Sequence, residues 1–159
     1  MNLINRRRYL IASQKKKNWF DFSKVTGAAN NAYTYQQAYA SVSGDKYIAK
    51  YGGYAMTCWV YDSRTTLPKG EYILSFTLYA PYNNGLFYTV AKMSSDPRKS
   101  IIATYSDWSC KANTHVDYSL QFSLEEETTV ILGLQGVGNS SSYLNLNYEF
   151  TNICIEKVG

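Results

Sequence analysis

The sequence predicts an all-β protein, an antiparallel β-sandwich or jelly roll preceded by an extended basic N-terminal arm. Two observations carry this prediction: short segments of alternating apolar and polar residues recur along the chain, and clusters of turn-forming residues separate them. The body of the chain shows no long apolar period of about 3.6 residues, which would indicate helices. A chain of 159 residues fits one domain. Because each half-buried strand has one apolar face, two sheets are needed to bury these faces.

Charge separates the first 24 residues from the rest of the chain. They contain seven basic residues and one acidic residue, a net charge of +6, whereas the other 135 residues carry nine basic and eleven acidic residues, a net charge of −2. We therefore predict a basic docking arm over residues 1–24 and a β-sandwich domain over residues 25–159. A solvated, disordered leader is the alternative for the arm, and a helix over residues 3–16 is a further one.

The arm has two kinds of side chain with which it could hold a partner. Its basic groups would pair with acidic surface groups, and its aromatic groups would make apolar contacts. The expected docking residues are Arg6, Arg7, Arg8, Lys15, Lys16, Lys17, Trp19, Phe20 and Phe22. Ordering such a segment costs roughly 1–2 kcal/mol per residue, so only an extensive interface would offset it.

The first strands are predicted between residues 46 and 61. Residues 46–51 and 56–61 each form a short apolar and aromatic segment, and Gly52 and Gly53 between them favour a turn. The sequence therefore predicts a hairpin here.

The clearest strand is predicted over residues 71–80, after a Pro-Lys-Gly turn. Its apolar side chains fall on one face: Tyr72, Leu74, Phe76 and Leu78. Ser75 and Thr77 fall on the other face. Because Asn-Gly at residues 84–85 is a strong hairpin signal, we expect residues 86–93 to return as the partner of this strand.

The second half of the chain continues the same pattern. We predict a strand over residues 100–105, an irregular stretch over 106–114, and strands over 116–124, 130–134 and 144–150. The acidic run 125–127 supplies a turn. After Phe150 the apolar phase shifts to Ile153 and Ile155, which predicts a β-bulge near Asn152.

Few residues of this sequence suit catalysis or metal binding. His115 is the single histidine, which excludes multi-histidine metal sites, and its place at a strand start does not suggest catalysis. The three cysteines form no C-x-x-C pair and fit a reducing compartment. No segment has the length of a membrane span or the pattern of an export signal. We expect no catalytic residue, no metal and no cofactor; a glycosidase using two of the available carboxylates is the enzymatic alternative.

Aromatic residues are the more informative group. Sixteen tyrosines are more than a core accommodates easily, because each buried hydroxyl needs a hydrogen-bond partner. Aromatic side chains at the surface stack on sugar rings or fill a pocket of a neighbouring subunit. The expected glycan or partner contacts are Trp59, Tyr61, Tyr82, Tyr105, Trp108 and Tyr143. For each of them taken singly, packing in the core or at its rim is the competing interpretation.

Four segments of the chain resemble a known group of proteins. LPKGEYILSFTLYA, HVDYSLQFSL, EEETTVILGLQG and YEFTNICIEKVG are similar to the second half of carbohydrate-binding-module-like jelly rolls, over about residues 67–159. Such modules occur in fibres, decoration proteins and baseplates of tailed bacteriophages and in bacterial glycosidases. The leader MNLINRRRYLIAS is similar to the starts of minor structural proteins in phages of gut Bacteroides-type hosts, including crAss-like phages.

This resemblance implies a non-enzymatic virion structural protein, a capsid decoration, head-fibre or tail-associated protein assembled in the cytoplasm of a bacterial host. Its partners would be capsid, collar or tail proteins, further copies of itself, and a glycan of the host surface. A nucleic acid is not expected as a partner, because the body has a net charge of −2, and a membrane is not expected, because no apolar segment is long enough to span one. Two alternatives stay open: a free lectin-like carbohydrate-binding module, and a nucleic-acid binder acting through the basic arm.

Overall fold

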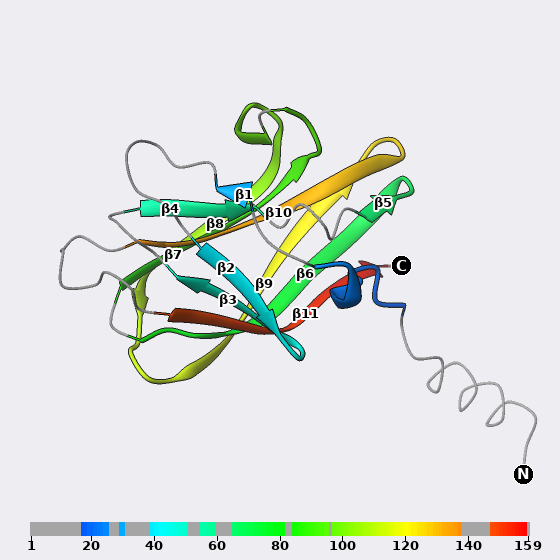
Figure 1. Cartoon of the computed structure of the whole chain (residues 1–159). Helices are drawn as coiled ribbons and strands as arrows, with labels where there is room; N and C mark the ends of the chain where they lie inside the picture. Colours follow the sequence, from blue (N-terminus) through cyan, green and yellow to red (C-terminus); the bar gives the residue numbers. More distant parts are fainter. Residues whose placement is uncertain are drawn as a thin grey trace, which may run out of the picture.

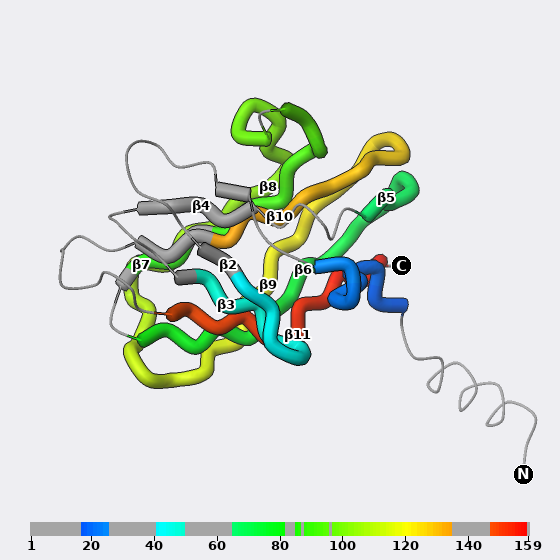
Figure 2. Tube along the Cα trace, in the orientation of Figure 1, coloured from blue at the N-terminus to red at the C-terminus, as the bar shows by residue number. Residues whose placement is uncertain are grey.

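A computed structural model describes residues 17–25, 29–30, 39–50, 55–59, 65–81, 84–95, 97–137 and 147–158. Two antiparallel sheets face each other in it, and the predicted all-β sandwich is confirmed (Figure 1). Residues 17–25 lie beside the end of the C-terminal strand (Figure 2). The possible helix over residues 3–16, and the arm residues Arg6, Arg7, Arg8, Lys15 and Lys16, lie outside the described residues.

One sheet has six strands, arranged in the order β1-β4-β10-β7-β8, with β5 pairing to β10 beside β4. Every described pairing in this sheet is antiparallel. Its strands are β1 (Ala29–Asn30), β4 (Ala55–Trp59), β5 (Thr65–Leu67), β7 (Asn84–Lys92), β8 (Ile101–Cys110) and β10 (Thr128–Val137).

The other sheet has five strands in the order β2-β3-β11-β6-β9, which places the C-terminal strand at its centre. Its strands are β2 (Tyr39–Ser43), β3 (Lys46–Lys50), β6 (Gly70–Tyr79), β9 (His115–Leu124) and β11 (Asn147–Val158). Two short 3-10 helices complete the described elements, η1 (Phe22–Lys24) and η3 (Pro97–Lys99).

Alternation decides which side chains of the five-stranded sheet enter the core. The face predicted for residues 71–80 is the buried one: Tyr72, Leu74, Phe76 and Leu78 are each at most 2% exposed. Aromatic rings fill the centre between the sheets. Phe76 lies edge-on to Tyr88 at 4.9 Å and near Phe150 at 5.6 Å between ring centroids. Such contacts add to the free energy gained by burying apolar area.

The predicted bulge in the last strand is confirmed. The pairing register between β11 and β6 shifts between Thr151 and Cys154, and Asn152 takes a positive φ of 53°. The inserted residue moves the buried positions from Phe150 to Ile153, so both stay in the core.

Both predicted hairpins are wrong. The segment predicted at residues 46–51 forms β3 of the five-stranded sheet, whereas β4 belongs to the six-stranded sheet. Likewise β6 pairs with β11 and β9, while β7 pairs with β10 and β8. In both places the chain crosses from one sheet to the other, because each strand then buries its apolar face against the opposite layer.

The irregular stretch predicted over residues 106–114 is also partly wrong, because β8 continues as a strand to Cys110. The pairing of β8 with β7 shifts register between Asp107 and Cys110, opposite Leu86 and Asn84, so the C-terminal end of β8 is irregular. The described residues contain no helix long and apolar enough to cross a membrane.

Candidate functional site

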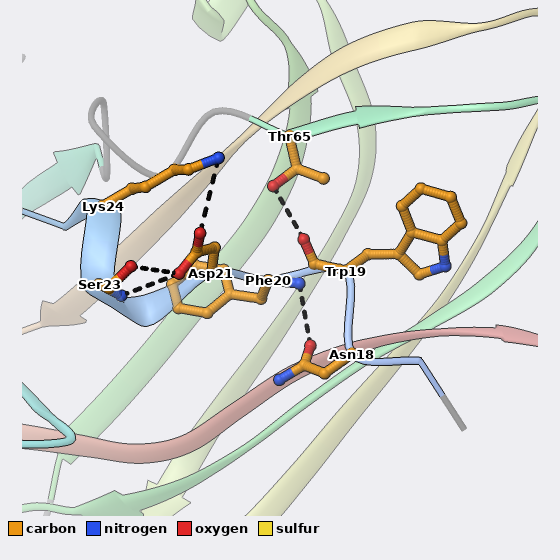
Figure 3. A network of polar contacts seen from close by, with 7 residues as sticks. All are labelled: Asn18, Trp19, Phe20, Asp21, Ser23, Lys24 and Thr65. Atoms are coloured by element: carbon orange, nitrogen blue, oxygen red, sulfur yellow. Dashed lines mark hydrogen bonds and ion pairs between the residues drawn. The ribbon is translucent and has the colours of Figure 1, made fainter. Parts of the chain in front are cut away.

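The described part of the predicted arm packs on the sandwich through Asn18. Its side chain receives a hydrogen bond from the Ile155 amide at 3.0 Å and donates one to the Ile153 carbonyl at 3.2 Å. Asn18 Oδ1, which accepts from Ile155, also accepts from the Phe20 amide at 2.9 Å (Figure 3). The Trp19 amide donates to the Ile155 carbonyl at 2.8 Å, which extends the pairing of β11 beyond its contacts with β3.

The next residue, Phe20, enters the core and is 5% exposed. Its ring meets that of Phe22 edge-on at 5.9 Å, and both Phe22 and Trp19 pack against the core from partly buried positions. Phe20 is therefore not available as an apolar anchor for a partner, which corrects the expectation for this residue. The domain boundary expected between residues 24 and 25 stays a prediction.

Polar contacts hold the rest of this segment (Figure 3). Asp21 caps η1 by accepting from the Ser23 amide at 3.1 Å and the Ser23 hydroxyl at 2.6 Å, and it ion-pairs with Lys24 at 3.5 Å. The Ser23 hydrogen bonds, followed by the charge of Lys24, hold the pKa of Asp21 below its usual value. The Lys17 ammonium lies 3.4 Å from the centre of the Trp19 ring, a cation–π contact. A groove of about 700 Å³ follows this segment as far as Thr65 and Thr66.

Two of the predicted contact residues lie on β8, an edge strand of the six-stranded sheet. Tyr105 is 47% exposed and Trp108 is 65% exposed. The Tyr105 ring lies 5.2 Å from that of Tyr88, which is buried. The Tyr105 ring therefore rests on the core on one side and faces solvent on the other.

Asp107 fixes the backbone between these two aromatic residues. It accepts from the Ser109 amide at 2.8 Å and hydroxyl at 2.7 Å, and from the Tyr118 hydroxyl of β9 at 2.9 Å. The Ser109 bonds lower the pKa of Asp107. Burial, followed by the bonds to Cys110 and Asp107, raises the pKa of Tyr118. This network joins the edges of the two sheets and holds β8 in place.

Trp59 lies elsewhere in the same sheet. Its backbone in β4 pairs with Gly133 of β10, Gly133 pairs with Thr89 of β7, and Thr89 pairs with Thr104 of β8. At strand spacings of about 4.8 Å, position 59 is about 14 Å from Thr104 across the sheet. The remaining predicted contacts lie outside the described residues: Tyr61, Tyr82 and Tyr143.

The sequence did not predict a second hollow, on the outer face of the five-stranded sheet. Its volume is about 440 Å³, and its polar lining comes from three strands: Ser75, Thr77, Asp117, Ser119 and Asn152. A signal was present, because the neighbouring outward positions Ser75 and Thr77 in one segment, and Asp117 and Ser119 in the other, all carry short polar side chains. Within the described part of the chain, no group of three or more His, Cys, Asp or Glu side chains could hold a metal ion.

Known structures share this fold. The chain is similar to the family 11 carbohydrate-binding module of a cellulosomal cellulase of Clostridium thermocellum, with a TM-score of 0.57, 12% identity, and coverage of 91% of this chain and 95% of that one. It is also similar to a carbohydrate-binding module from Cellvibrio mixtus lichenase 5A, solved in complex with cellotriose, with a TM-score of 0.54, 12% identity, and coverage of 88% and 96%.

A third similar structure is the enzymatically active domain of bacteriophage CBA120 tailspike protein 4, with a TM-score of 0.53 and 9% identity. The match covers 92% of this chain but only 21% of that one. No family model and no curated protein matches the chain. At these identities the comparisons show the fold, a jelly-roll sandwich of the carbohydrate-binding-module type.

Proposed function

We propose that this protein is a non-catalytic carbohydrate-binding module that contacts saccharide rings through the exposed aromatic side chains of β8. The observation that carries the proposal is the exposure of two large aromatic side chains on one edge strand, 47% for Tyr105 and 65% for Trp108. Large exposed aromatic groups cost solvation free energy unless a ligand or partner covers them. Saccharides suit them, because the apolar face of a sugar packs on an aromatic ring while its hydroxyls bond to neighbouring polar groups.

The fold supports the same conclusion. Similar structures include modules whose names state carbohydrate binding, and one of them was solved with cellotriose. Asp107 lies between Tyr105 and Trp108 and remains a carboxylate at neutral pH, since hydrogen bonds lower its pKa. Its oxygens accept from Ser109 and Tyr118, so Asp107 holds the backbone of β8 that presents the two aromatic side chains.

The test is affinity electrophoresis of the full-length protein in gels that contain neutral polysaccharides. We expect retardation by at least one of them and a dissociation constant about 30-fold higher for Trp108→Ala, the effect of losing about 2 kcal/mol at a central aromatic contact. Ile101→Ala is the matched control, because Ile101 is 51% exposed on the same strand. Equal retardation of all three proteins contradicts the proposal.

A second role is supported by the charge asymmetry of the chain and by the similarity to a tailspike domain. We propose that the module belongs to a bacteriophage virion and docks through its basic N-terminal residues. Deletion of residues 2–16 leaves Asn18 and its bonds intact. In particles made from a genome that encodes this chain, the deletion abolishes incorporation while the purified variant still binds saccharide. Normal incorporation of the shortened chain refutes this role.

A further inference from the structure

The groove on the outer face of the five-stranded sheet has a definite structural origin. Ser75 of β6 pairs with Ser119 of β9 on one side and with Cys154 of β11 on the other. Thr77, next along the same face, pairs with Asp117 and Thr151. Short side chains on three adjacent strands leave a hollow that longer ones would fill, and its volume is about 440 Å³.

The β-bulge supplies the wall of this groove. Asn152 is the residue inserted in β11, and its positive φ of 53° turns its exposed side chain toward β6. Its Nδ2 donates to the Thr77 hydroxyl at 3.2 Å, and that hydroxyl donates to Oδ1 of Asp117 at 2.7 Å. Thr77 thus holds an amide and a carboxylate on either side of it. Asn152 Oδ1 and Asp117 Oδ2 take no part in these two bonds, and both can accept from a ligand.

An aromatic pair borders the groove. Tyr79 follows Thr77 on the same face of β6 and pairs with His115 of β9, with ring centroids 5.2 Å apart. The Tyr79 hydroxyl donates to Asn113 at 3.0 Å, which holds its ring in place. Tyr79 lies one pleat beyond Thr77, about 7 Å along the strand, so one ligand can reach both.

We propose that this groove is a second saccharide-binding site, separate from β8, which takes a neutral sugar with vicinal hydroxyls. The inference rests on the proposed function and adds a site to it. The sugar hydroxyls bond to the Asp117 carboxylate and the Asn152 amide, and the edge of the sugar ring contacts Tyr79. The groove belongs to the sheet opposite the one that contains Tyr105 and Trp108, so the two sites can be occupied independently.

Charge favours a neutral ligand. Asp117 is the charged residue among the described residues that line the groove. Glu149 of β11, which pairs with Tyr79 of β6, is neutralised by an ion pair with Lys46 at 2.7 Å. A sugar carboxylate would therefore meet an uncompensated negative charge at Asp117, and uronic-acid oligosaccharides bind more weakly than neutral ones.

The test is an NMR titration of the uniformly labelled full-length protein with neutral gluco-, xylo-, manno- and galacto-oligosaccharides. The side-chain amide of Asn152 reports on the groove, and the indole N–H of Trp108 reports on β8. We expect both signals to shift with the same saccharide. Asp117→Asn weakens binding at the groove about tenfold, because it removes a charged acceptor, and leaves binding at Trp108 unchanged.

A second variant distinguishes a loss of saccharide binding from a loss of folding. Asn152→Gly keeps the left-handed backbone, which glycine adopts without strain, and removes the amide group. We expect it to abolish groove binding, read from the backbone amides of Thr77 and Asp117. Glu127→Gln is the matched control, because it removes one exposed carboxylate three residues beyond the C-terminal end of β9.

Each outcome separates the two proposals. Shifts at Trp108 without shifts at Asn152 overturn the groove site and leave the proposed function standing. Shifts at Asn152 that Asp117→Asn weakens support the groove, and if Trp108 stays unchanged they also overturn the role of β8. No shift at either position overturns both.

Discussion

Phe20 offers a sharp test of how the N-terminal segment relates to the sandwich. A residue that serves a partner stays exposed in the isolated protein, whereas Phe20 is 5% exposed and belongs to the core. Returning a buried phenylalanine to water costs about 2–3 kcal/mol, and the cavity left by alanine raises the total to about 3–4 kcal/mol. For a protein of this size, that loss lowers the melting temperature by roughly 10 °C.

The assay is urea unfolding of the purified full-length protein and of Phe20→Ala, followed by tryptophan fluorescence and by circular dichroism. Ser23→Ala is the control in the same segment, because Ser23 is exposed and its loss should cost no more than about 1 kcal/mol. If Phe20→Ala changes the free energy of unfolding by less than about 0.5 kcal/mol, the segment does not belong to the domain and the reasoning fails.

Two further predictions concern stability. Asn18→Ala removes three hydrogen bonds to the backbone and lowers the free energy of unfolding by about 2–3 kcal/mol; a change near zero in urea unfolding contradicts this. Asp107 and Tyr118 give the pH dependence. The lowered pKa of Asp107 makes stability fall as pH drops below about 4. The raised pKa of Tyr118 makes stability fall above about pH 10, where the unfolded chain releases a proton that the folded one keeps. In a plot of the free energy of unfolding against pH, we expect a shallower slope below about pH 4 for Asp107→Asn and above about pH 10 for Tyr118→Phe. Slopes equal to those of the unaltered protein refute these assignments.

The local pattern of the sequence predicts strands well where one face is buried. Alternation identifies the core face of β6 from Tyr72 to Leu78, because a strand against a core must place every second side chain inward. The bulge at Asn152 follows from the phase shift between Phe150 and Ile153, both of which must stay buried.

Partners of strands are harder to predict than strands. The Asn-Gly signal at residues 84–85 predicts a turn, but these two residues begin β7, which pairs with β8 and β10 rather than with β6. Turn residues determine the local backbone and carry no information about which layer the next strand joins. That choice depends on packing between the sheets, a non-local term that a single sequence does not display.

Long-range contacts also explain what the site predictions missed. Asn18 accepts a hydrogen bond from Ile155, 137 positions away in the sequence. Because this contact positions the neighbouring Phe20, the local sequence does not indicate that Phe20 is buried. The groove depends on Asn152 reaching Thr77 across 75 positions. Tyr105 and Trp108 are exposed, as a surface contact requires, and their contact with a ligand stays a prediction.

The central claim is that saccharides bind to the aromatic edge of β8. The most direct measurement is the ratio of dissociation constants of Trp108→Ala and the unaltered protein for one neutral polysaccharide, with Ile101→Ala measured beside them. The account predicts a ratio of about 30 for Trp108→Ala and about 1 for Ile101→Ala. No binding by the unaltered protein, or equal ratios for the two variants, would contradict it.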